Sequence, residues 1–403
     1  MTTPTSAASS TPRGTITVHV FGRTDVGRTR EHNEDAFLVA DLSANTVGEQ
    51  AEAWTHPLGA RGALFMVADG LGGAAAGEIA SGMAVDIVLQ EVRRTWVNTP
   101  QTDPDSFAHA LKKACESANT RIYEYAVKNP DHRGLGTTAT IAGLLGGTLY
   151  LVQVGDSRAY IVRGGVAQQI TKDQSLMQRL IEAGELTPEE AEQSERRNII
   201  LQALGPEPTV KIDLTHQPVR RGDVLVLCTD GLSGQVRKDE IAQIVAEERD
   251  LEAAGQMLID RANANGGPDN ITVVLARLEG DGLLPVSAGD RVGHSVFELA
   301  NATPSTPRAP LRPITGKMRA VAAPTPAENA EVPPAAARPA SGRGNQILLV
   351  ALAAVLVIAI VAFIVVHLRG AVSDASEPST TPPAQGAPAP ADTLAGRAAP
   401  ASQ

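Results

Sequence analysis

Acidic residues stand beside apolar, strand-like runs in five places along this sequence, and glycine often follows them. The five segments are Asn33-Glu34-Asp35, Val67-Ala68-Asp69-Gly70, Val154-Gly155-Asp156-Ser157-Arg158, Cys228-Thr229-Asp230-Gly231 and Pro268-Asp269-Asn270. Each segment alone is also typical of an ordinary turn, because Asp-Gly and Asp-Asn pairs are common there. Together they predict carboxylates that converge at the ends of central strands. Like charges so placed destabilise a fold unless cations lie between them.

A site built from oxygen ligands selects hard cations such as Mg²⁺ or Mn²⁺. Zinc prefers histidine or cysteine, and none of the eight histidines shows the spacing of zinc ligands. The two cysteines, Cys115 and Cys228, belong to no CxxC motif, which favours a reducing compartment. Cys228 is predicted to be a small buried apolar residue. The sequence therefore predicts a magnesium or manganese site and leaves open which ion it prefers.

Both strands and helices must position these carboxylates. Apolar β-type runs predict strands at residues 16–22, 36–39, 63–68, 139–145, 148–154, 159–162, 224–228 and 272–276. Apolar residues at helical spacing predict helices at 74–96, 106–127, 176–183, 239–248 and 251–264. Grouped strands with paired helices between them favour a layered α+β fold over a parallel βαβ sheet.

Composition divides the 403 residues into folded and unfolded parts. Residues 1–14 are rich in Ser, Thr and Pro, lack the apolar core of a signal peptide, and are predicted to be disordered. Residues 15–279 have the composition of a globular domain, whereas residues 280–345 are typical of a Pro/Ala-rich linker. Within that linker, residues 292–300 are mixed enough to dock locally. The net charge of −10 argues against nucleic acid as a partner.

Residues 347–366 form an uninterrupted apolar run of twenty residues without charge or proline. At helical rise this run spans roughly 30 Å, the thickness of a bilayer's hydrocarbon core, and predicts one transmembrane helix within 346–367. Without a signal peptide, the preceding domain is expected to remain cytoplasmic. The chain is thus predicted to be a single-pass protein of the cell (inner) membrane, with a disordered tail, residues 368–403, outside.

Six segments in order closely resemble the protein phosphatase 2C family of metal-dependent phosphatases, bacterial type. They are Asp25-Val26-Gly27-x-x-Arg30-x-x-Asn33-Glu34-Asp35-Ala36, Val67-Ala68-Asp69-Gly70-Leu71-Gly72-Gly73, Gly136-Thr137-Thr138-Ala139-Thr140, Val154-Gly155-Asp156-Ser157-Arg158-Ala159-Tyr160, Thr229-Asp230-Gly231-Leu232 and Asp269-Asn270-Ile271-Thr272-Val273-Val274. The resemblance covers roughly residues 18–278. It implies that residues 15–279 form an α-β-β-α sandwich, in which two antiparallel sheets are flanked by helices and enclose a dinuclear metal site.

The resemblance also implies a set of metal ligands. Asp69 would bridge two ions. Asp230 and Asp269 would hold one of them, and Glu34 with the backbone carbonyl of Gly70 would hold the other. Glycine suits position 70, because its carbonyl must approach an ion closely.

Further roles follow from the same resemblance. Bacterial members often bind a third ion, and Asp156 matches its ligand, assisted by Asp230 and by a carbonyl near Asn198 in the flap segment, residues 176–204. Asp35 would orient the attacking water. Arg30 would clamp the substrate phosphate; its alternative is a surface ion pair with Glu31 or Glu34.

These roles imply that a hydroxide formed between two to three Mn²⁺ or Mg²⁺ ions hydrolyses phosphoserine and phosphothreonine in proteins. The implied partners are phosphoprotein substrates and the bacterial Ser/Thr kinases that the enzyme would oppose. One alternative is a catalytically silent phosphatase-like domain that binds phosphoproteins, although every carboxylate is retained. Another is a two-metal nuclease or small-phosphoester hydrolase, which the acidic charge and the motif order oppose.

Other positions extend or depart from the family pattern. Leu71 stands where many eukaryotic members carry a histidine proposed as general acid, which leaves the proton donor undefined, and Gln174 stands where many relatives have histidine. Gly136-Thr137-Thr138 lacks the lysine of a P-loop and is predicted to begin a strand that packs near the site. Thr187 and Pro188 predict the start of a helix in the flap. Residues 41–61 are interpreted as a surface loop insertion.

Overall fold

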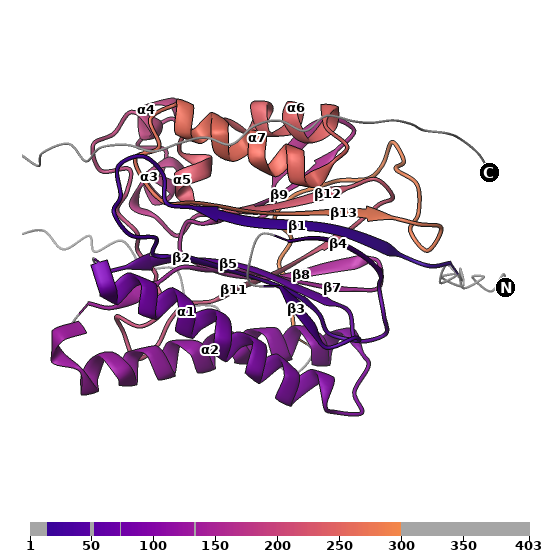
Figure 1. Ribbon diagram of the computed structural model, residues 1–403, viewed down its shortest axis with the longest axis horizontal. Coiled ribbons are helices and arrows are strands. Elements are labelled where there is room, and N and C mark those ends of the chain that lie inside the picture. Colours follow the sequence, from indigo (N-terminus) through magenta and orange to yellow (C-terminus); the bar gives the residue numbers. More distant parts are fainter. Residues whose placement is uncertain (1–13, 49–51, 73, 133, 300–403) are drawn as a thin grey trace, which may run out of the picture. The chain divides into compact units, whose positions relative to one another are not determined.

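The computed structural model describes residues 14–48, 52–72, 74–132 and 134–299. In these residues two antiparallel sheets stack face to face, and paired helices cover the outer face of each sheet (Figure 1). The predicted α+β sandwich is therefore confirmed. No helix of the described part is long and apolar enough to cross a membrane. The predicted span at 347–366, the residues 1–13 and the chain beyond 299 lie outside the described residues.

The first sheet carries two of the segments predicted to hold acidic ligands. In spatial order its strands are β10 (Val166–Gln169), β9 (Arg158–Arg163), β12 (Val224–Cys228), β13 (Ile271–Glu279), β1 (Thr17–Asp25) and β4 (Glu52–Pro57). Three helices follow β12 in the chain, namely α5 (Asp230–Ser233), α6 (Lys238–Glu247) and α7 (Leu251–Ala264). All five residues of β12 are buried, as its continuous apolar sequence predicts for a central strand.

The second sheet carries the other carboxylates. Its strands in order are β11 (Asp213–Pro218), β8 (Thr148–Val154), β7 (Ala139–Leu145), β5 (Ala63–Leu71), β2 (Asp35–Asp41) and β3 (Thr46–Gly48), with β6 (Gly136–Thr137) paired to the end of β5. Its outer face is covered by α1 (Ala74–Val92), the π-helical turn η1 (Arg93–Val97) and α2 (Pro104–Lys128). The short elements η2 (Pro130–His132), α3 (Leu176–Glu182) and α4 (Pro188–Glu192) complete the fold.

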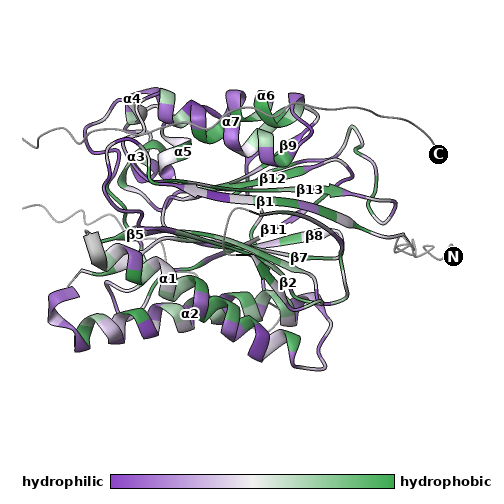
Figure 2. Cartoon of the chain, in the orientation of Figure 1, coloured by the Kyte–Doolittle hydropathy of each residue, from purple (hydrophilic) through white to green (hydrophobic). Residues whose placement is uncertain are grey.

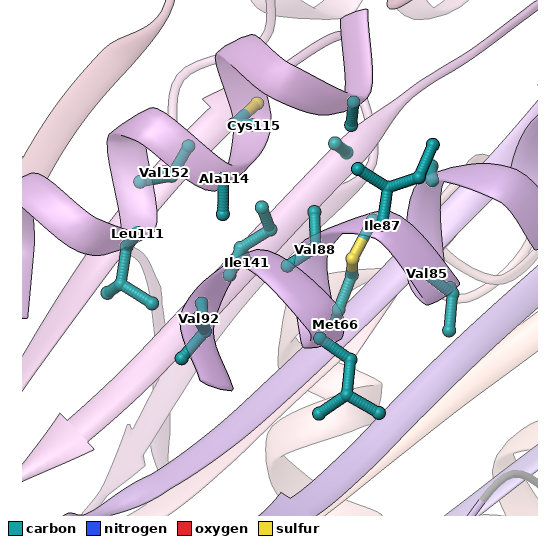
Figure 3. Close-up of a cluster of buried hydrophobic side chains, with 14 of the residues drawn as sticks. Met66, Val85, Ile87, Val88, Val92, Leu111, Ala114, Cys115, Ile141 and Val152 are labelled. Atoms are coloured by element: carbon teal, nitrogen blue, oxygen red, sulfur yellow. The ribbon is translucent and has the colours of Figure 1, made fainter. Parts of the chain in front are cut away.

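Three apolar layers hold the sandwich together. One lies between the second sheet and α1 and α2, where Met66 of β5 and Ile141 of β7 pack with Val88 and Leu111 of the helices (Figure 3). The second fills the space between the sheets, and the third lies under α6 and α7. Figure 2 shows the helices with their hydrophobic sides towards the sheets. Each fully buried Leu, Ile or Phe contributes about 1.5–3 kcal/mol relative to exposure.

The flap begins with helix α3 and continues through α4. The predicted start of α4 is confirmed: the Thr187 hydroxyl accepts a hydrogen bond from the backbone N–H of Glu190, the Glu190 carboxylate accepts one from that of Thr187, and Pro188 follows the cap. This reciprocal arrangement satisfies two N–H groups that a helix start leaves without partners. The flap thus contains two short helices and lies between β10 and β11 in the chain.

The interpretation of residues 41–61 as a surface loop insertion is wrong. This segment forms β3 at one edge of the second sheet and β4 at one edge of the first. In β4, Trp54 and His56 turn inward and stack at 4.3 Å, whereas Ala53 and Thr55 are exposed. Such alternation is typical of a half-buried edge strand. The strand is short and has few apolar residues, so the sequence did not indicate it.

Residues 280–299, which we call the C-terminal segment, pack on the domain although composition assigns them to the linker. Leu283 is only 2 % exposed and belongs to the layer between the sheets. The Phe297 ring meets Tyr150 edge-on at 5.2 Å between centroids. Backbone hydrogen bonds join Ser295 and Phe297 to β11. The local docking expected for 292–300 is therefore observed as far as residue 299.

Candidate active site

The predicted carboxylates meet at one end of the sandwich and come from both sheets. Asp35 begins β2 and lies opposite Asp69 of β5 in the strand register. Asp230 is the first residue of α5 and is separated from the end of β12 by Thr229 alone, and Asp269 immediately precedes the Asn270 that leads into β13. Asp156 lies in the turn from β8 of the second sheet to β9 of the first. The predicted convergence is thus present.

Burial and mutual repulsion raise the pKa values of the carboxylates in this cluster. Desolvation raises the pKa of Asp69 well above its ordinary value, and nearby Asp35, Asp230 and Asp156 raise it further. Desolvation likewise raises the pKa of Asp35 and of Asp156 to about 7, in both cases with a contribution from Asp230. The pKa of Asp230 is raised by desolvation and then by Asp269. The site therefore favours protons or other cations among its carboxylates.

Two threonines fix Asp35 between the sheets. The hydroxyls of Thr229, at the end of β12, and Thr272, in β13, donate to the same carboxylate oxygen, Oδ2, at 2.8 and 2.6 Å. The other oxygen, Oδ1, receives neither of these bonds. The first sheet thus holds the Asp35 carboxylate in one orientation through its Oδ2 atom.

The Gly136-Thr137-Thr138 segment packs against the site as predicted. The Thr138 hydroxyl accepts a hydrogen bond from the backbone N–H of Asp69 at 2.9 Å, and the Thr137 hydroxyl donates to the backbone carbonyl of Asp69 at 2.9 Å. A further bond of 2.8 Å links Thr138 to Ser157, the neighbour of Asp156. This strand therefore fixes the backbone of Asp69 and ties it to the turn that carries Asp156.

Gly70 and Glu34 lie where two backbone segments cross. The N–H of Gly70 donates to the carbonyl of Glu34 at 3.1 Å. A Cβ atom at position 70 would overlap the carbonyl oxygens of Gly77 and Glu34, so only glycine fits. Desolvation raises the pKa of Glu34, whereas Arg30 opposes that rise.

Arg30 forms an ion pair, but with neither of the acids considered from the sequence. Its guanidinium donates to Asp269 at 2.8 Å, and the two side chains are 48 % and 31 % exposed. Arg30 is thus a half-exposed cation at the edge of the carboxylate cluster. Asn198 is exposed in the flap, and within the described residues no hydrogen bond joins it to the cluster.

Sequence reasoning missed some positioning residues. Asn270, only 4 % exposed, accepts from the backbone N–H of Glu34 and donates to the carbonyls of Val26 and His32. It thereby ties the loop before β2 to the start of β13. Its place beside Asp269 in the motif was the available signal. Gln174 accepts from the N–H of Gly155 at 3.0 Å and so supports the Asp156 turn.

Hard divalent cations fit this donor set. Its side-chain donors are all carboxylates, and the Asp156 Oδ1 atom is buried without a hydrogen-bond partner among the described residues. In the part of the chain that the structure describes, no three His, Cys, Asp or Glu side chains are already arranged to hold an ion. Because zinc prefers nitrogen and sulfur, an all-oxygen site selects Mg²⁺ or Mn²⁺. Cys115 and Cys228 are buried free thiols, and burial raises the pKa of Cys228 to about 12.

Comparison with known proteins agrees with this geometry. The family model described as protein phosphatase 2C matches residues 50–275. The serine/threonine phosphatase stp of Listeria monocytogenes is 36 % identical over 258 residues, which cover 64 % of this chain and 95 % of that protein. The chain therefore belongs to the protein phosphatase 2C family. It is a metal-dependent protein serine/threonine phosphatase.

Two solved structures are similar in fold as well as in sequence. The serine/threonine phosphatase of S. agalactiae superposes with a TM-score of 0.57 at 33 % identity, over 65 % of this chain and all of that chain. The catalytic domain of the phosphatase PstP, crystallised with two manganese ions, superposes with a TM-score of 0.53 at 33 % identity, over 66 % of this chain and 99 % of that domain.

Proposed function

We propose that the chain hydrolyses phosphoserine and phosphothreonine in proteins with two Mn²⁺ or Mg²⁺ ions held at the carboxylate cluster. Asp69 would contact both ions. Asp230 and Asp269 would complete one side of the site, and Glu34 with the Gly70 carbonyl the other. The observation that carries this proposal is the convergence of acids from both sheets, whose raised pKa values show that protons or other cations are favoured among them.

A third ion would lie between Asp156 and Asp230, with the carbonyl near Asn198 as a further ligand. The buried Oδ1 atom of Asp156, which lacks a partner among the described residues, supports this assignment. The pKa of Asp156 is raised by desolvation and then by Asp230, as expected for two buried acids that lie close together with no cation between them. The two manganese ions of the related PstP domain support Mn²⁺ as the first ion to test.

Two residues would act on the substrate directly. When bound, the ions would supply positive charge beside the phosphoryl group and lower the pKa of the attacking water. Arg30 would leave Asp269 to donate two parallel hydrogen bonds to phosphoryl oxygens. Asp35 would orient the water through Oδ1, because both threonines bind Oδ2. Leu71 has no proton to give to the leaving oxygen.

The substrates would be phosphoproteins made by bacterial Ser/Thr kinases. A single span within 346–367 would hold the enzyme at the cell (inner) membrane, with the catalytic domain cytoplasmic and residues 368–403 outside. The twenty apolar residues at 347–366 support the span. Anchoring would raise the local concentration of enzyme near membrane-bound kinases. Deleting 347–366 should release the protein from membranes, and pelleting of the deletion variant in high salt would contradict the anchor.

Metal-dependent turnover tests the central proposal. The full chain in detergent should hydrolyse an aryl phosphate and a phosphothreonine peptide with Mn²⁺ or Mg²⁺, and excess chelator should stop both reactions. Full activity in chelator would falsify the assignment. A phosphopeptide that binds without turnover in saturating metal would instead indicate the silent phosphoprotein-binding domain.

A further inference from the structure

A concave surface lies between the flap, the start of β11 and the C-terminal segment. We call it the flap groove. It has a volume of about 1040 Å³. Its lining includes Arg179 of α3, Gln174, Leu214 of β11, and Val296 and Phe297 of the C-terminal segment. Apart from Gln174, which supports the Asp156 turn, none of these side chains belongs to the active site as assigned above.

The C-terminal segment contributes one side of the groove by adding to the edge of the second sheet. The N–H of His216 donates to the carbonyl of Ser295 at 2.9 Å, and the N–H of Phe297 donates to the carbonyl of Leu214 at 3.0 Å. Together they pair Val296 with Thr215 in an antiparallel bridge. This side of the groove is therefore held by backbone hydrogen bonds as well as by the Phe297 ring.

One side chain connects the groove with the catalytic cluster. The Gln174 amide oxygen accepts from the N–H of Gly155, and its amide nitrogen donates to Asp213 at 3.1 Å. The backbone of Gln174 also accepts from the N–H of Leu201 in the flap at 2.8 Å. Gly155 directly precedes Asp156. Gln174 therefore contacts both the groove and the turn that carries the proposed third-ion ligand.

Large apolar side chains are exposed at the groove. Val296 is 65 % exposed and Leu201 is 39 % exposed, and both line it. Ile199, whose carbonyl accepts from the N–H of Leu176 at the start of α3, is 42 % exposed on the same flap. Exposed apolar residues gathered at a concave surface with a polar rim are typical of a protein interaction site.

The charges that line the groove favour an acidic ligand. Lys172 and Lys211 are paired with Glu182 and Asp213, which also line it. Arg179 has no ion pair among the described residues, and Lys112 reaches only Glu116, at 4.0 Å. The carboxylate of Asp173 is held by Arg158 at 2.7 Å. Two lining cations, Lys112 and Arg179, are therefore available to a ligand. Glu298 is the one lining carboxylate without an ion pair within the described residues.

We propose that the flap groove binds the polypeptide flanking the phosphorylated residue of a protein substrate, with acidic side chains against Lys112 and Arg179 and an apolar one against Leu201 and Val296. This inference rests on the proposed function. The chain's own linker is a poorer occupant, because residues 300–346 carry six Lys and Arg and only two Glu. A basic linker does not complement these cations.

Charge reversal in the full-length chain in detergent tests the proposal. The double variant Lys112→Glu/Arg179→Glu should raise KM about tenfold for a phosphothreonine peptide with acidic flanks, since two cross-interface charge pairs become repulsive. It should lower KM for the same peptide with lysine flanks. Turnover of an aryl phosphate, which has no flanks, should not change. Fluorescence anisotropy with the unphosphorylated acidic peptide should show the same loss of binding without any catalysis.

A matched control lies on the same helix. Arg121 is also exposed on α2, nine positions from Lys112 and therefore on the opposite side of the helix. Arg121→Glu should leave all three substrates unaffected. Val296→Ser, which removes apolar area without charge, should weaken both peptides and spare the aryl phosphate.

Three results would overturn the proposal. An equal loss on the aryl phosphate would assign the groove a structural role. Unchanged peptide kinetics and binding would remove the interaction altogether. A change in peptide KM after reversing linker charges, as in Arg308→Glu/Arg312→Glu, would assign the groove to the linker. If the unaltered chain failed to hydrolyse the aryl phosphate with metal, the proposed function itself would fail, whereas the anisotropy measurement would still report on the groove.

Discussion

The two ends of strand β12 carry aspartates with opposite surroundings. Asp223, fully buried just before the strand, receives two hydrogen bonds from the Arg163 guanidinium, at 2.8 and 2.6 Å. Asp230, just after the strand, has the carboxylates of Asp69 and Asp269 as neighbours, and its pKa is raised. The charge of the aspartate at one end of the strand is thus balanced by an arginine of the protein, whereas the aspartate at the other end has other carboxylates as neighbours.

This difference separates a structural carboxylate from a ligand-binding one. A buried ion pair with good geometry satisfies its own charge, and removing one partner leaves the other buried and alone. A cluster of acids without enough internal cations is stable only with protons or external cations. The C-terminal segment strengthens the first end, since Asp290 binds Arg220 at 2.6 Å and Leu284 accepts from the N–H of Arg221. We therefore call the end of the sandwich at Asp223 the structural end, and the end at Asp230, where the proposed metal ligands lie, the catalytic end.

The largest expected effect is at the catalytic end. Asp230→Ala should lower phosphatase activity by at least about a thousandfold. It removes a proposed ligand of the metal ions, whose positive charge would stabilise the transition state. The metal-free variant should unfold cooperatively and be at least as stable as the parent chain, since one repulsive charge is gone. Steady-state kinetics and urea unfolding measure the two quantities. Retained turnover would remove Asp230 from the site.

The reverse pattern is expected at the structural end. Asp223→Ala should lower the free energy of unfolding by about 3–5 kcal/mol, because the Arg163 guanidinium, whose side chain is 9 % exposed, loses its partner. Activity per folded molecule should stay close to that of the parent chain. Urea unfolding with active-site titration separates these effects. A variant that is stable but inactive would contradict the division between the two ends.

The pH dependence of stability should differ with and without metal. Asp35 and Asp156 have folded-state pKa values of about 7, against an ordinary value of 3.8. Between about pH 4 and pH 7 the unfolded chain loses protons that the folded, metal-free chain retains, so its stability should fall as pH rises, by up to about 1.4 kcal/mol per pH unit for each such proton. Saturating Mn²⁺ should abolish this fall. A stability that rises through this range without metal would exclude the raised pKa values.

The smallest expected effect concerns the C-terminal segment. A chain that ends after Glu279 should be less stable than one that ends after Leu299 by about 2–3 kcal/mol, because it loses the buried Leu283 and the packed Phe297. Metal-dependent hydrolysis of an aryl phosphate should be the same for both. Thermal unfolding compares them directly. Equal stability would mean that the segment contributes no net packing energy.

Much of the catalytic end could be predicted from the sequence, whereas the structural end could not. The acids at the catalytic end stand in ordered motifs beside strongly apolar strands such as β12 and β13. The ion pair of Asp223 with Arg163 joins residues sixty positions apart, and only the register of β9 with β12, which pairs Val162 with Val224, brings them together. No local pattern encodes that register.

The strand β4 and the docking of residues 280–299 also depend on contacts between residues far apart in the sequence. The strand β4 has only six residues, too few to show a clear alternating pattern in the sequence. Its pairing with β1, which makes it an edge strand, is visible only in the structure. Composition assigns residues 280–299 to the linker because the whole stretch 280–345 is rich in Pro, Ala, Arg and Ser and has almost no aromatic residues. A few well-placed side chains, above all Leu283 and Phe297, are enough to dock the segment on an existing core.

Anomalous diffraction from crystals grown with Mn²⁺ tests the division between the two ends most directly. Manganese peaks are expected among Asp69, Asp230 and Asp269, with a further peak at Asp156 at higher concentration, and none beside Asp223. Peaks confined to surface carboxylates, with the cluster empty at saturating Mn²⁺, would contradict it.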